Sequence, residues 1–138
     1  MNSRVIPSRP AVDPTCFLRK TLLADAVFAG VSGVVFLVAP GPIASLVGLS
    51  SALTVAGVGF VLIAYAAGLV RSARQKRVTR ADALAPIALN LAWVAGTAFV
   101  VAAGALSRQA NWALLMVADG VLLFAVLEGV GLRRMATS

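Results

Sequence analysis

The sequence predicts an all-α fold, a transmembrane four-helix bundle with both termini cytoplasmic. The chain of 138 residues is 60% hydrophobic and only 12% charged, whereas soluble domains carry about 25% charged residues. Its mean hydropathy is +0.95. It also contains four long apolar runs, each near the roughly 20 residues that cross a bilayer as a helix. Together these observations exclude a water-soluble globular protein.

The first apolar run covers about 22–39 and stops at Pro40 and Pro42, which cannot donate helical hydrogen bonds. We expect helices in all four runs, because lipid leaves no partner for unpaired backbone groups and the runs lack the alternation of barrel strands. The short uncharged segment 43–49 follows the prolines. It is too short to span, so we expect a turn of helix lying at the membrane interface.

The second and third runs flank the basic segment 71–80. The second covers about 52–70 and carries no charge. The third covers about 84–105, and Asp82 is a suitable N-cap residue for it. Pro86 then falls in the opening turns of the helix, where a missing N–H matters least.

The fourth run covers about 112–132, with Trp112 suited to one headgroup layer. These runs form a single transmembrane domain over 18–134. The segment 1–17 is expected to be a flexible cytoplasmic tail, too short and too polar to bury a core of its own. Residues 135–138 form a second cytoplasmic tail.

The basic residues predict the orientation, because cytoplasmic flanks of membrane helices are enriched in lysine and arginine. All 12 except Arg108 lie before the first run, between the second and third, or after the fourth. We expect these flanks to contact anionic lipid headgroups. We expect no nucleic acid, since the charges are not interleaved with aromatic residues. The expected lipid-contacting residues are Arg19, Lys20, Arg71, Arg74, Lys76, Arg77, Arg80, Arg133 and Arg134.

Each apolar run carries one polar side chain at a similar depth from the cytoplasmic side: Asp25, Tyr65, Asn90 and Glu128, with Trp93 on the Asn90 face. An ionisable group at the bilayer centre costs about 2.5–3.5 kcal/mol, so it reaches water, pairs or serves a function. The first interpretation is structural: the carboxylates reach headgroups or pair with nearby basic residues, while Asn90 and Tyr65 make interhelical hydrogen bonds. The functional alternative is a small polar site, open to the cytoplasm, for a proton, a cation or an amine.

Asp119 and Cys16 lie apart from this cluster. Asp119 is nine residues from Glu128, which places the two on opposite faces of one helix. Asp119 therefore faces a second subunit, reaches water at the outer mouth, or is neutral and hydrogen-bonded in place; a homo-oligomer or a larger membrane complex hides both faces most simply. Cys16 is expected as an idle thiol, with acylation or oxidation as the alternative.

The composition excludes several kinds of chemistry. The chain has no histidine and one cysteine, which excludes His-dependent nucleophilic catalysis, the usual zinc sites and an intramolecular disulfide. It has no phosphate-binding glycine loop, nucleotide fingerprint or nucleophile elbow. We therefore expect no cofactor, no metal and no enzymatic activity.

Three short motifs resemble small four-helix integral membrane proteins of high-GC bacteria: LRKTLLAD at 18–25, ALNLAW at 88–93 and LEGVGLRR at 127–134. That family is largely uncharacterised, so the resemblance implies a topology and a bacterial inner membrane but no activity. The chain is more loosely similar to the small multidrug transporters, which also have four helices and an essential membrane carboxylate. Theirs is a glutamate in the first helix, where this chain has Asp25.

Two functional interpretations follow. The first is a non-enzymatic structural or accessory subunit of the inner membrane, since no catalytic constellation is present. The alternative is a small transporter or proton-coupled exchanger. In that case Asp25 and Glu128 bind the transported species, and Tyr65, Asn90 and Trp93 line the site.

Overall fold

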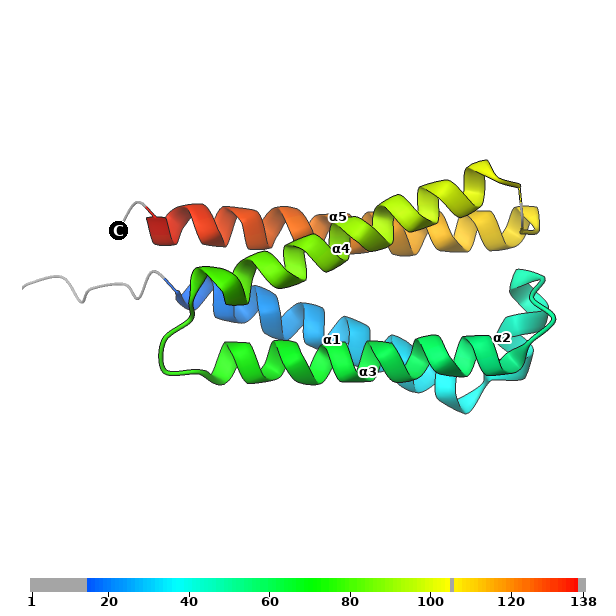
Figure 1. Cartoon of the computed structure of the whole chain (residues 1–138), viewed down its shortest axis with the longest axis horizontal. Helices are drawn as coiled ribbons and strands as arrows, with labels where there is room; N and C mark the ends of the chain where they lie inside the picture. The colour runs from blue at the N-terminus through cyan, green and yellow to red at the C-terminus, as the bar shows by residue number, and fades with distance from the viewer. Residues whose placement is uncertain (1–14, 105, 137–138) are drawn as a thin grey trace, which may run out of the picture.

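The computed structural model describes residues 15–104 and 106–136, and within them all regular secondary structure is helical (Figure 1). Four of its helices are long and apolar enough to cross a membrane, consistent with a small four-helix membrane protein. Most of the expected tail 1–17 lies outside the described residues. The helices are α1 (Cys16–Val38), α2 (Pro40–Val47), α3 (Ala52–Arg74), α4 (Arg80–Ala102) and α5 (Arg108–Ala136).

The two prolines after α1 both stop one helix and start the next. α1 ends at Val38, and α2 opens with Pro40 in its first turn, where a backbone N–H has no helical partner anyway. α2 ends at Val47 and is followed by Gly48 at its C-cap, whose φ of 77° lies in the left-handed region that favours glycine. With 8 residues, α2 is too short to span and packs across one end of the bundle against α3 and α5.

The start of α4 differs from the sequence prediction, because Asp82 is not the N-cap. The N-cap is Thr79, whose Oγ1 accepts from the backbone N–H of Asp82 at 3.3 Å, while the Asp82 carboxylate accepts from the Thr79 N–H at 2.8 Å. This reciprocal capping box stabilises a helix that begins at Arg80. Asp82 also accepts from Ser72 Oγ at 3.1 Å and Gln75 Nε2 at 3.4 Å, which ties α4 to the end of α3.

The long helices pack as two pairs. α1 lies along α3, and α4 lies along α5 (Figure 1). The pairs meet mainly where α1 contacts α5, whereas α3 and α4 scarcely touch although they are consecutive in the chain. The seam between α3 and α4 is therefore the loosest part of the bundle.

Two glycines allow α1 and α3 to pack closely together. A Cβ on Gly33 would lie 2.8 Å from the carbonyl oxygen of Gly59, and a Cβ on Gly59 would lie 2.8 Å from the carbonyl oxygen of Gly33. Both distances are too short for real atoms, so the two backbones touch here only because side chains are absent. Close backbone approach at small residues is a common way for helices to associate in lipid, where the hydrophobic effect does not drive association.

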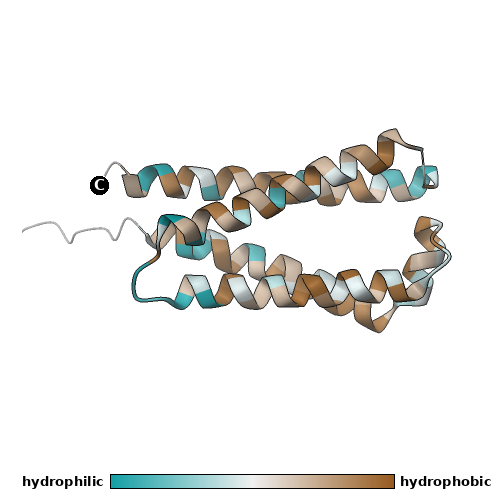
Figure 2. Ribbon diagram, in the orientation of Figure 1, coloured by the Kyte–Doolittle hydropathy of each residue, from teal (hydrophilic) through white to brown (hydrophobic). Residues whose placement is uncertain are grey.

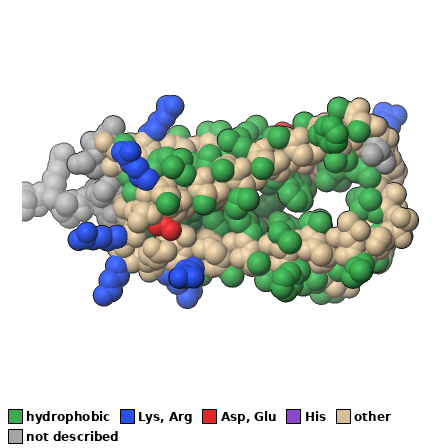
Figure 3. All heavy atoms as spheres, in the orientation of Figure 1, with side chains coloured by type: hydrophobic (Ala, Val, Ile, Leu, Met, Phe, Trp, Pro, Cys, Tyr) green, Lys and Arg blue, Asp and Glu red, His purple; other side chains and the backbone are tan. Residues whose placement is uncertain are grey.

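Basic side chains gather at the end of the bundle where α1 and α4 begin and α3 and α5 finish (Figure 3). The ribbon is hydrophilic there and largely hydrophobic along the helices (Figure 2). We call this the basic end and the opposite one the α2 end. A buried apolar core supports the basic end, including Leu18, Leu22, Leu69 and Ala83.

Most of the basic residues expected at a lipid surface are exposed at this end, but Arg19 is engaged within the protein. Its guanidinium donates to the carbonyl oxygen of Ala73 at 2.7 Å and to that of Lys76 at 3.2 Å, which caps the last turn of α3. Arg134 lies over the ring of Phe17, 4.7 Å from its centroid. The other exposed members are Lys20, Arg71, Arg74, Lys76, Arg77, Arg80 and Arg133.

Replacing Gly59 with alanine should separate α1 from α3 and lower the free energy of unfolding in detergent by about 1–3 kcal/mol, as overpacking does. Gly96→Ala is the matched control, because a Cβ there meets nothing within 4 Å. It should leave the thermal midpoint unchanged or slightly raised. Equal midpoints for the two variants would contradict the contact between the two backbones.

Candidate functional site

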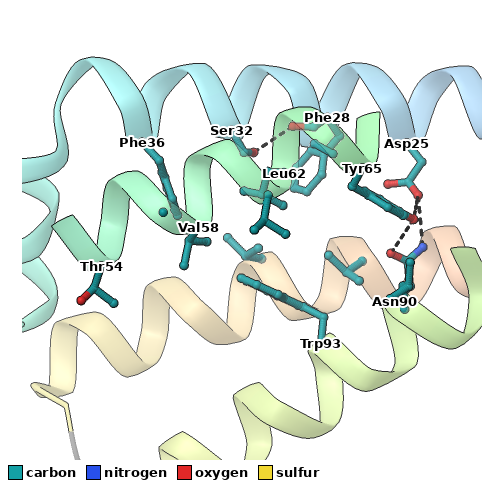
Figure 4. A pocket seen from close by; sticks show the side chains of 16 residues that line it. Asp25, Phe28, Ser32, Phe36, Thr54, Val58, Leu62, Tyr65, Asn90 and Trp93 are labelled. Carbon is teal, nitrogen blue, oxygen red and sulfur yellow. Dashed lines mark hydrogen bonds between the residues drawn. The ribbon is translucent and has the colours of Figure 1, made fainter. Parts of the chain in front are cut away.

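One polar side chain from each long helix meets in a single buried cluster: Asp25 of α1, Tyr65 of α3, Asn90 of α4 and Glu128 of α5 (Figure 4 shows the first three). The Tyr65 hydroxyl lies 2.9 Å from Asp25 Oδ2 and 3.1 Å from Asn90 Oδ1. Asn90 Nδ2 donates to Asp25 Oδ2 at 3.1 Å and to Glu128 Oε2 at 3.4 Å. The cluster therefore joins the α1–α3 pair to the α4–α5 pair.

Asn90 is the centre of this cluster because its amide carries both kinds of hydrogen-bonding group. Its Nδ2 bears two hydrogens, which serve the two carboxylates, and its Oδ1 is an acceptor for Tyr65. A carboxylate has no hydrogen to offer, and the single hydroxyl hydrogen of Tyr65 serves one acceptor at a time. The cluster is therefore short of donors: Glu128 Oε1 is buried and has no hydrogen-bond partner among the residues that the structure describes.

The two carboxylates are shielded from the outside. Asp25 is 2% exposed, Glu128 is 0% exposed, and Asn90 between them is 4% exposed. In the part of the chain that the structure describes, their hydrogen bonds run to Tyr65 and Asn90 and to no lysine or arginine. The structure thus does not show the two carboxylates reaching the headgroup region or pairing with basic flanks. Two acidic groups thus share one interior site in which no basic residue of 15–104 or 106–136 is hydrogen-bonded to them.

A cavity of about 530 Å³ lies beside the cluster, between the two helix pairs. Asp25, Tyr65 and Asn90 line its polar end. The rest of its wall is mostly apolar and includes aromatic rings, among them Phe28 and Phe36 of α1 (Figure 4). The space-filling view shows a hollow between the two pairs, nearer the α2 end (Figure 3). A molecule in this cavity would meet the Asp25 carboxylate at one end and mostly hydrocarbon surfaces elsewhere.

Trp93 belongs to the cavity wall rather than to the hydrogen-bonded cluster. Its ring lies along the cavity (Figure 4), and its indole Nε1 is buried without a hydrogen-bond partner. An unpaired N–H in an apolar wall leaves a donor available to a bound molecule. Residues that sequence reasoning did not single out also line this wall, including Phe28, Phe36 and Ser32. Their apolar or hydroxyl side chains look like ordinary helix residues in the sequence, and only the three-dimensional hollow distinguishes them.

The remaining expected positions lie elsewhere. Asp119 is exposed on α5, on a different face from the buried Glu128, and makes no hydrogen bond with the described residues. Cys16 is an exposed free thiol at the start of α1. Across residues 15–104 and 106–136, no three histidine, cysteine, aspartate or glutamate side chains lie close enough to hold a metal ion.

Comparisons with protein-family models, with curated proteins and with solved structures give no match for this chain. The protein is therefore classified from its architecture. Four apolar helices that can each cross the bilayer indicate a multi-pass membrane protein. The site must be interpreted from its own chemistry.

Replacing Asn90 with leucine should lower the free energy of unfolding by about 1–3 kcal/mol, because it removes the hydrogens on which both buried carboxylates depend. Thr97→Val is the control, since Thr97 is equally buried on α4 but lies outside the cluster. It should change stability by less than about 0.5 kcal/mol. Unfolding of both variants in detergent, followed by helical circular dichroism, measures the difference. Equal losses would mean that the cluster does not join the helix pairs.

Proposed function

We propose that this protein is a small proton-coupled exchanger of the bacterial inner membrane, with both termini in the cytoplasm and a lipophilic ammonium cation as its substrate. One observation carries the proposal. Two buried carboxylates, hydrogen-bonded to no lysine or arginine of the described residues, share one cluster, and one of them, Asp25, lines the polar end of a largely apolar, aromatic cavity.

The carboxylates supply the charge. An ionised carboxylate in an apolar interior is strongly unfavourable unless it is paired. Here Asn90 and Tyr65 supply hydrogen bonds, but no lysine or arginine among the described residues supplies a positive charge. A proton or a bound cation provides the missing charge. Glu128 Oε1, buried without a hydrogen-bond partner among the described residues, is one place where a proton is able to bind, and the Asp25 carboxylate, which lines the cavity, is where a cation is able to bind.

The cavity wall supplies affinity for the organic part of the substrate. Aromatic faces attract ammonium groups through cation–π interactions, which strengthen when the site is dry. Phe28, Phe36, Tyr65 and Trp93 line the cavity. A volume of about 530 Å³ is that of an ordinary small-molecule pocket. The substrate we infer is therefore an amine or quaternary ammonium carrying an apolar or aromatic group.

Exchange follows from competition for the same carboxyl groups. A site with few hydrogen-bond donors accepts either a proton or the organic cation in place of the missing charge, and binding of one displaces the other. Such competition is the thermodynamic requirement for coupling two transported species. The role of accessory subunit, expected first from the sequence, gains no specific feature from the structure, whereas the cavity and the cluster both favour the exchanger.

Binding tests the proposal directly. The chain has two tryptophans, so Trp112→Phe leaves Trp93 in the cavity as the only indole reporter. Phenyltrimethylammonium should change Trp93 fluorescence in detergent or nanodiscs, whereas tert-butylbenzene, its uncharged analogue of the same shape, should bind at least about tenfold more weakly. Glu128→Gln should weaken phenyltrimethylammonium binding by about tenfold or more.

Asp119→Asn is the matched control, because it removes a carboxylate from the exposed face of the same helix. It should leave the affinity unchanged. In proteoliposomes, phenyltrimethylammonium added outside should enter while protons leave, so that an enclosed dye reports a rise in pH. Equal binding of charged and uncharged analogues, or binding without proton movement, would contradict the proposed exchanger.

A further inference from the structure

A second cavity, of about 290 Å³, lies in the seam between α3 and α4 toward the basic end. Its lining comes from these two helices alone. At one end lie Ser72 and Asp82, which are hydrogen-bonded to each other across the seam at 3.1 Å. At the other end lie Tyr65 and Leu89, which also line the main cavity. The two cavities are therefore neighbours with a shared wall.

We propose that this second cavity is a water-filled vestibule that gives the carboxylate site access from the basic end, with Tyr65 and Leu89 as the partition between it and the main cavity. This inference extends the proposed function and rests on it. An exchanger must open its site to each side of the membrane in turn, and the main cavity by itself reaches the cluster only from the other side of Tyr65.

The chemistry of the vestibule suits water and a passing cation. Asp82 provides a carboxylate and Ser72 a hydroxyl at the end nearest the basic segment. Pro86, also in the wall, has no N–H to donate to the carbonyl oxygen of Asp82, four residues earlier. A helical carbonyl without its usual partner is a further acceptor for water or a cation.

The partition is thin and held by few interactions. On the α3 side, the hydroxyl of Tyr65 is within hydrogen-bonding distance of Asp25 and Asn90, the residues that would bind the substrate. On the α4 side, Leu89 is exposed rather than packed in a core. Because α3 and α4 scarcely touch, no close helix packing blocks movement of these two side chains. Capture of a proton or cation by Asp25 would compete with its bond to Tyr65 and leave the hydroxyl with Asn90 as its one acceptor in the cluster, which loosens the ring and links occupancy to opening.

Cysteine accessibility in vesicles tests the vestibule, and the chain offers matched positions. Cys16→Ser removes the sole cysteine. Gly68 lines the second cavity, Gly57 lines the main one, and Gly96 lines neither; an added Cβ meets nothing within 4 Å at any of the three. The probe is a charged, membrane-impermeant methanethiosulfonate. Native Cys16, exposed at the basic end, reports which side of the vesicle that end faces.

From the basic-end side, the cysteine of Gly68→Cys should react at least about tenfold faster than that of Gly96→Cys, because only a hydrated thiol forms the reactive thiolate. The cysteine of Gly57→Cys should be protected from that side while Tyr65 is present. Tyr65→Ala should expose it, raising its rate about tenfold by the same thiolate argument. Leu89→Ala should open the same partition from the α4 side. It replaces Tyr65→Ala in this test if the tyrosine variant fails to fold.

Two results would overturn the inference: a cysteine at Gly68 as unreactive as one at Gly96, or a cysteine at Gly57 whose rate from the basic-end side is unaffected by either partition variant. These outcomes are separate from the fate of the proposed exchanger. If accessibility behaves as stated but Trp93 does not respond to phenyltrimethylammonium, the vestibule stands and the substrate assignment fails. If binding and proton exchange occur while the cysteine of Gly68→Cys is unreactive, the exchanger stands and its second route lies elsewhere.

Discussion

Two carboxylates buried among apolar helices, with no basic side chain of the described chain beside them, are the constraint on which the rest of this structure depends. A buried charge must be hydrogen-bonded, paired or neutralised. Here hydrogen bonding falls to one amide and one hydroxyl, those of Asn90 and Tyr65. Since each long helix contributes one member, meeting this requirement also fixes how the four helices are arranged around one another.

The same constraint explains why the bundle is uneven. α1 and α3 are in backbone contact at Gly33 and Gly59, and α4 lies along α5, but α3 and α4 scarcely touch. Two tightly packed pairs joined by a polar cluster leave room between them, and both cavities lie in that room. Between α3 and α4, the hydrogen bonds of the cluster thus take the place of close packing. A site that is held by exchangeable bonds is able to respond to a ligand, whereas a packed core is not.

The sequence predicted the apolar spans and the depth of the polar residues, because both follow from the rise of a helix and from lipid thickness. Depth alone placed Asp25, Tyr65, Asn90 and Glu128 at one level. Their convergence required the rotation of each helix about its axis, which packing sets and one sequence does not reveal. The nine-residue spacing of Asp119 and Glu128 placed them on opposite faces, and the structure has one exposed and the other buried. The Gly33–Gly59 contact and the cavities were beyond prediction, since glycine is abundant here and a hollow depends on which helices fail to pack.

The central claim is that the cluster couples one helix pair to the other, and a double-mutant cycle between Tyr65 of α3 and Asn90 of α4 tests it most directly. The unfolding free energies of Tyr65→Phe, Asn90→Leu and the double variant, measured in one detergent, give the interaction energy of the two side chains. The structure predicts a coupling of about 0.6–1.7 kcal/mol, the range of interhelical hydrogen bonds in membrane proteins. Effects that add within about 0.3 kcal/mol would contradict the account, because independent sites behave that way.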